Sequence, residues 1–146
     1  MKITLFTSNL NRHNYLINLL SGVSDELFVI QECNTIFTGI MPGHYKATPI
    51  MKKYFENVNN AQSKFFGNSY INNKNKNIKI LPMLLHDLSK CSMNLLSDFL
   101  KSDVYVVFGS SYIKNELVDF LVEKKAINIH AGVSPYYRGT DCNFWA

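Results

Sequence analysis

The sequence predicts an α/β fold in which helices cover both faces of a mostly parallel sheet. Short apolar runs alternate along the chain with segments whose apolar residues recur at helical spacing. Two of these runs, residues 27–30 and 104–108, are apolar throughout, as in strands buried on both faces of a parallel sheet. A length of 146 residues and an apolar content of 47% suit one domain with a substantial core. We therefore expect a single domain over residues 1–146.

The N-terminal third of the chain predicts a β-α-β unit. Residues 2–7 have the composition of a strand, and residues 8–11 form a turn with good helix N-cap residues. Apolar residues then recur at helical spacing between residues 15 and 20, and Ser21-Gly22 ends that helix. Residues 27–30 supply the second strand.

The middle of the chain predicts a long helix between two loops. Residues 34–45 contain Gly39, Pro42 and Gly43 and indicate a loop, after which Pro49 occupies a plausible first helical turn. The helical spacing continues to Phe66, and residues 67–77 are dominated by Asn and Lys, which is typical of an exposed connection. A short strand over residues 78–81 follows, closed by a proline.

The last third completes the alternation of helices and strands. The first element is a helix capped by Asp87 or Ser89 that runs to Leu100. A buried strand follows over residues 104–108 and is broken by Gly109-Ser110-Ser111. A helix from Ile113 to Lys124-Lys125 and a fifth strand over residues 126–129 complete the series.

Composition and charge narrow the class of protein. The mean hydropathy is −0.06, and no apolar run approaches the roughly 18–20 residues that a membrane-spanning helix needs. The N-terminal run is too short for a secretory signal, so we expect a cytoplasmic protein with no membrane partner. The net charge of +4 comes from dispersed lysines, which permits nucleic-acid binding without indicating it.

Several kinds of site find no support in the sequence. The three cysteines are scattered and odd in number, which favours free thiols in a reducing compartment. No cluster of His, Cys, Asp and Glu has metal-ligand spacing, so we expect no metal. Neither the G-x-G-x-x-G pattern nor the G-x-x-x-x-G-K-[ST] pattern occurs. His13, His44 and His86 are isolated, and we expect them to have surface or structural roles.

Polar residues do gather where three predicted strands end. The junctions are Thr7-Ser8-Asn9, Gly109-Ser110-Ser111 and Asn128-Ile129-His130, and ligands of open α/β sheets bind beyond such carboxyl ends. Asn128 and His130 lie two residues apart, so in a strand they would project to the same face. An amide can bind a carbonyl oxygen and an imidazole can exchange a proton. Taken alone, this pair fits a functional site and a structural strand end about equally, and Arg138-Gly139 fits an anion contact as well as an ordinary turn.

The same stretch resembles the signature of a known family, the 10-formyltetrahydrofolate-dependent formyltransferases. That family usually shows N-I-H-P-S-L-L-P-x-Y-R-G, and seven positions match at the same spacing: Asn128, Ile129, His130, Pro135, Tyr137, Arg138 and Gly139. Residues 103–113 resemble the family's apolar strand, glycine and following helix start. The loose resemblance covers nearly the whole chain, although only the last third is specific.

The resemblance implies a Rossmann-like formyltransferase fold and a one-carbon transfer. A substrate amine would attack the formyl carbon of 10-formyltetrahydrofolate, the co-substrate, while Asn128 donates a hydrogen bond to the oxyanion and His130 shuttles a proton. The residues implied in folate binding are Gly109, Ser110, Ser111, Tyr112, Ile113 and Pro135. The residues implied in binding the amine are Ser8, Asn9, Arg138 and Gly139.

The amine itself stays open at this point. An amino sugar nucleotide or methionyl-tRNA is the first expectation, so nucleic acid enters only as a tRNA-linked substrate. The alternatives are phosphoribosylglycinamide formyltransferase, which the lack of a glycine-rich N-terminal turn weakens, and a non-catalytic folate- or nucleotide-binding domain of the same fold. The oligomeric state is not predicted.

The chain also departs from the family's pattern. Residues 131–134 (Ala-Gly-Val-Ser) replace the family's Pro-Ser-Leu-Leu. The family's third catalytic residue is an Asp some tens of residues after the His, and Asp141 lies too close to His130 to be that residue. We therefore expect a domain incomplete at its C-terminal end, which would leave this chain inactive on its own.

Overall fold

The computed structural model describes residues 1–34, 48–72, 74–133 and 135–137. It contains a five-stranded sheet with the order β3-β2-β1-β4-β5, and every strand pair is parallel. The strands are β1 (Lys2–Ser8), β2 (Glu26–Cys33), β3 (Ile78–Leu84), β4 (Val104–Phe108) and β5 (Ile127–Asn128). This confirms the predicted parallel α/β, Rossmann-like architecture.

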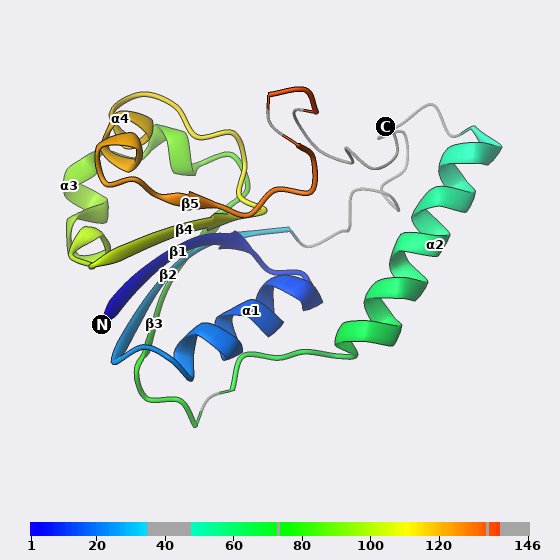
Figure 1. Ribbon diagram of the computed structural model, residues 1–146, viewed down its shortest axis with the longest axis horizontal. Coiled ribbons are helices and arrows are strands. Elements are labelled where there is room, and N and C mark those ends of the chain that lie inside the picture. Colours follow the sequence, from blue (N-terminus) through cyan, green and yellow to red (C-terminus); the bar gives the residue numbers. More distant parts are fainter. Residues whose placement is uncertain (35–47, 73, 134, 138–146) are drawn as a thin grey trace.

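Helices cover both faces of the sheet (Figure 1). One face carries α1 (Asn11–Ser21), and the other carries α3 (Met93–Leu96) and α4 (Glu116–Glu123). Two short 3-10 turns, η1 (Leu88–Lys90) and η2 (Ser97–Leu100), flank α3. The connection from β4 through α4 to β5 has the length that a parallel crossover requires.

The alternation of side chains along the central strand β1 divides the core into two layers. Leu5 belongs to the cluster under α1, with Ile17 and Val29, whereas its neighbour Phe6 packs with Leu117 under α4. Successive strand residues point to opposite faces, so the single strand β1 contributes side chains to both clusters. Residues 3–8 are buried for this reason.

The helix α2 (Pro49–Phe66) lies away from the sheet, and its C-terminal end lies near α1 (Figure 1). Its ends are those that the sequence predicts: Pro49 occupies the first turn after the Thr48 cap, and Gly67 follows the last residue. Arg12 Nη1 donates to Gln62 Oε1 at 3.0 Å, and the rings of Tyr15 and Phe66 lie 5.4 Å apart. These contacts hold the C-terminal half of α2 against α1.

Two predicted boundaries were wrong. The strand expected to close at Pro82 continues to Leu84, because β3 is an edge strand and an edge strand uses only part of its N–H groups. The helix expected from Asp87 or Ser89 to Leu100 is divided into η1, α3 and η2. Ser92 caps α3 instead, accepting a hydrogen bond from the Leu95 N–H at 3.3 Å.

The other elements match their predictions with small shifts. β2 extends three residues past Ile30 to Cys33, α4 begins at Glu116, and β5 is limited to two residues. Residues 67–72 and 74–77 form a connection, as predicted, whereas the loop predicted over residues 34–45 lies largely outside the described residues. Across the ranges that the structure describes, no helix is long and apolar enough to cross a membrane.

Candidate functional site

The three polar junctions meet at one edge of the sheet, because β1, β4 and β5 are neighbours and run parallel. Thr7 at the end of β1 pairs with Phe108 at the end of β4, and the Thr7 hydroxyl donates to the Phe108 carbonyl at 2.7 Å. Val107 pairs with Asn128, and the Ile129 N–H donates to the Val107 carbonyl at 2.9 Å. The carboxyl ends of the three strands therefore form a continuous edge, where ligands of this fold class bind.

Asn128 and His130 are both exposed at this edge. Among the residues that the structure describes, the Asn128 amide makes no hydrogen bond, so its N–H groups can meet a ligand oxygen. His130 Nε2 lies 3.1 Å from the Tyr137 carbonyl oxygen. A carbonyl oxygen only accepts, so Nε2 is the donor in this contact. An amide and an imidazole thus lie two residues apart along the chain at this edge.

The turn after β4 depends on glycine at position 109. Gly109 has a φ of 71°, and a Cβ at this position would lie 2.3 Å from Nε2 of His13. His13 is only 1% exposed and packs its ring edge-on against Phe108, with 5.0 Å between centroids. Its Nδ1 accepts the Leu10 N–H at 3.3 Å at the start of α1. The β4 turn therefore lies directly on the His13 ring.

Burial controls the protonation of His13. Desolvation first, and the positive charge of Arg12 second, lower the pKa of His13 from 6.5 to about 3. Its Nε2 atom is buried and has no hydrogen-bond partner among the residues that the structure describes. The structure thus gives this histidine the structural role that the sequence suggested. It also places the ring under the candidate site, which the sequence did not indicate.

A second residue of the site, Glu32, was missed from sequence. Its carboxylate is completely buried at the carboxyl end of β2 and accepts hydrogen bonds from the Ser111 N–H at 2.5 Å, the Ser111 hydroxyl at 2.8 Å and the His86 N–H at 2.9 Å. The available signal was the pair Gln31-Glu32 after the apolar run 27–30, which is the same change from apolar to polar that marks the other junctions.

The segment predicted to bind folate is well anchored. The Ser110 hydroxyl donates to the Ser111 carbonyl at 3.2 Å, and Ile113 packs against the core cluster under α4. Tyr112 is 80% exposed, while its carbonyl accepts the Ser89 hydroxyl at 2.8 Å. Pro135 is also exposed. The segment therefore presents an aromatic ring and backbone groups on a fixed support.

The residues predicted to bind the amine are placed differently. Ser8 is buried, and its hydroxyl lies 3.5 Å from Asn9 Oδ1. The Asn9 amide is engaged twice with the backbone of Asn34, donating to its carbonyl at 2.9 Å and accepting its N–H at 3.0 Å. Arg138 and Gly139 lie outside the described residues. A role for these four residues in binding the amine stays a prediction.

Other potential sites are limited. Within residues 1–34, 48–72, 74–133 and 135–137, no group of three or more His, Cys, Asp and Glu side chains could hold a metal ion. An open hollow of about 290 Å³ lies between η1 and the start of α4, lined among others by Ser89, Cys91 and Lys114. Neither Asn128 nor His130 lines this hollow, so its position does not coincide with the strand-end chemistry.

Comparison with known proteins supports the fold. No protein-family model matches the chain, and no curated protein matches it. A crystal structure of phosphoribosylglycinamide formyltransferase from Anaplasma phagocytophilum superimposes with a TM-score of 0.51 at 14% sequence identity. The match covers 99% of this chain and 56% of that chain, so this chain spans little more than half of its structural relative. The likeness shows that the chain has a formyltransferase-like fold, as the signature around Asn128 predicts.

Proposed function

We propose that this protein transfers a formyl group from 10-formyltetrahydrofolate to an amine. The observation that carries the proposal is the strand end at Asn128 and His130, which lies beside the β4 turn at Gly109 on a formyltransferase-like sheet. The described residues supply an amide donor, a proton acceptor and an anchored loop at this edge. These are the groups that an acyl transfer between two nitrogens requires.

The transfer proceeds by addition and elimination. The amine nitrogen bonds to the formyl carbon, and the formyl oxygen becomes an oxyanion that accepts a hydrogen bond from the Asn128 amide. His130 takes the proton released by the attacking nitrogen and returns it to N10 of the folate as the C–N10 bond breaks. The products are the formylated amine and tetrahydrofolate, and no external oxidant or reductant is needed.

The folate co-substrate is assigned to the 109–113 segment. Hydrogen bonds from Ser111 and Ser89 already hold the segment, which favours binding because little backbone entropy is lost when the ligand arrives. Pro135, which follows His130 in the sequence, is assigned to the folate as well. The exposed Tyr112 ring supplies a flat apolar surface suited to a fused heterocycle.

The first candidates for the amine are an amino sugar nucleotide and methionyl-tRNA. Glycinamide ribonucleotide is about equally supported, because the fold neighbour is a phosphoribosylglycinamide formyltransferase. The turn after β1 lacks the glycines of a phosphate-binding loop, which argues against that substrate. A folate-binding protein without turnover is the alternative from another class. This alternative predicts that the protein binds tetrahydrofolate but does not release tetrahydrofolate from 10-formyltetrahydrofolate when an amine is added.

The test is a screen of these three amines with 10-formyltetrahydrofolate, following tetrahydrofolate release by the full-length protein. Asn128→Ala should lower kcat by about 10²–10³-fold, the usual effect of removing one oxyanion donor. Asn94→Ala, an exposed asparagine on α3, is the matched control and should leave kcat unchanged. Equal kcat values for Asn128→Ala and the wild type, or no release with any amine, would contradict the proposal.

A further inference from the structure

We propose that Glu32 is a positioning residue that holds the 109–113 segment in the conformation that binds folate. The inference rests on the proposed function and extends it to a residue outside the Asn128–His130 strand end. Glu32 would touch neither the folate nor the amine. It would act through the backbone of the loop that contacts the folate.

Glu32 places a carboxyl group in the interior of the protein. A carboxylate removed from water costs several kcal/mol unless hydrogen bonds replace its hydration. Glu32 has no exposed surface and, among the described residues, makes no ion pair. Its compensation comes from three donors on two loops, two of them backbone N–H groups of Ser111 and His86. Breaking these bonds would leave a charge buried without partners, so the loops and the carboxylate constrain each other.

The topology of the sheet explains why this constraint acts on the site. Glu32 is on β2, Ser111 follows β4, and β1 lies between those two strands. Neighbouring strands are about 4.8 Å apart, so Ser111 must reach across the end of β1, a span of roughly 10 Å, to donate to Glu32. The segment after Gly109 is therefore drawn over the carboxyl end of β1, with the His13 ring directly beneath it.

Backbone geometry on both loops supports the same conclusion. Gly109 has a φ of 71°, and His86, the other donor residue, has a φ of 73°, which is uncommon for a residue with a side chain. Both left-handed residues lie within two positions of a bond to Glu32. The carboxylate thus offsets the conformational cost of two tight turns at the edge of the site.

The consequence for Ser111 differs from the sequence-based assignment. Its N–H and its hydroxyl both donate to Glu32, so neither of these groups donates to a ligand in this arrangement. Ser111 then contributes to folate binding by fixing the positions of Ser110 and Tyr112. A preformed loop should affect the affinity for folate more than the chemical step at Asn128.

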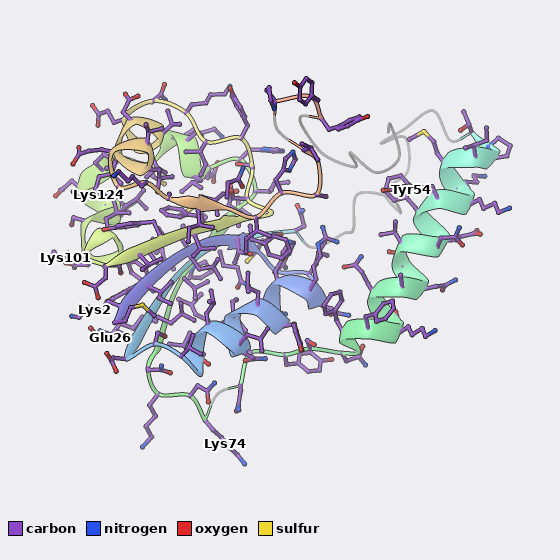
Figure 2. All side chains as sticks on the ribbon, in the orientation of Figure 1. Lys2, Glu26, Tyr54, Lys74, Lys101 and Lys124 are labelled. Atoms are coloured by element: carbon purple, nitrogen blue, oxygen red, sulfur yellow. The ribbon has the colours of Figure 1, made fainter. Side chains whose placement is uncertain are left out.

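The decisive variant is Glu32→Gln, which keeps the shape of the side chain and replaces one accepting oxygen with a donor. We expect tetrahydrofolate to bind about tenfold or more weakly, because hydrogen bonds to a charged acceptor are lost. We also expect faster hydrogen–deuterium exchange of the Ser111 and His86 amides. In the transfer assay, the change in KM should be larger than the change in kcat. Glu26→Gln is the matched control: Glu26 is on the same strand but pairs at the surface with Lys2 (Figure 2) and also with Lys79. It should behave like the wild type.

Two outcomes would overturn the proposal: unchanged amide exchange in Glu32→Gln, or faster exchange with tetrahydrofolate affinity within twofold of the wild type. If Glu32→Gln does not fold, Ser111→Ala removes only the hydroxyl donor, and the same two measurements then decide. If the wild type itself binds no tetrahydrofolate, the proposed function fails. The exchange measurement would still show whether Glu32 anchors the loop.

Discussion

Lowering the pH from about 7.5 to about 5.0 should destabilise the folded protein through one buried histidine, His13. The folded state holds the pKa of His13 at about 3, against 6.5 for a solvated imidazole. Between these values the unfolded chain binds a proton that the folded chain does not, so stability falls as the pH falls. The slope is about 1.4 kcal/mol per pH unit well below pH 6.5, and the loss over this interval amounts to about 2 kcal/mol.

Urea denaturation at the two pH values, followed by far-ultraviolet circular dichroism, measures this loss as a change in the free energy of unfolding. His13→Gln removes the titration and should reduce the pH dependence by about 2 kcal/mol. His86→Asn is the control, because His86 is exposed and asparagine tolerates its left-handed backbone. Lysine partners lower the pKa values of the Glu26 and Asp98 carboxyl groups, and both variants retain these groups, so they do not distinguish the variants. The same pH dependence in His13→Gln and wild type would refute the reasoning.

Two further substitutions test the fold around the site. Gly109→Ala should lower the free energy of unfolding by more than about 1 kcal/mol, because the backbone has a positive φ and the new Cβ would meet His13 Nε2. Gly22→Ala is the control and should change the free energy of unfolding far less, because Gly22 has a φ of −73°. Equal thermal midpoints for the two variants would contradict this account. Leu5→Ala should cost about 2–5 kcal/mol, since Leu5 is fully buried between the sheet and α1. Leu95→Ala, at a position 61% exposed, should cost little in the same urea titration, and a similar loss for both leucines would be inconsistent with the two-layer core.

The sequence predicted those limits of helices and strands that depend on residues close together in the chain. The limits of α2 follow from Pro49 and Gly67, and the strand 104–108 follows from an unbroken apolar run ending in glycine. Whether Pro82 ends a strand depends on which strand lies beside it, and that is a property of the assembled sheet. The segment before β4 offered several neighbouring cap residues, and the structure uses Ser92 as the cap of α3.

The site shows the same division. Parallel topology brings the ends of β1, β4 and β5 to one edge, and the polar junctions after apolar runs predicted that edge from sequence. Glu32 follows the same change from apolar to polar residues, but its contact with Ser111, like that of His13 with the turn at Gly109, arises only when the loop after β4 packs across the sheet. A local pattern can mark such a residue as polar at a strand end, but it does not identify the group that the residue contacts across the sheet.

The central claim is that the formyl group moves from folate to an amine at Asn128 and His130. The most direct measurement uses 10-formyltetrahydrofolate with a ¹³C-labelled formyl carbon and follows the label by NMR in the presence of the full-length protein and each candidate amine. The account predicts a new formamide carbon signal with the true substrate, and a strongly reduced rate of its appearance in Asn128→Ala and His130→Ala. A label that stays on the folate, or that reaches the amine equally fast in both variants, would contradict it.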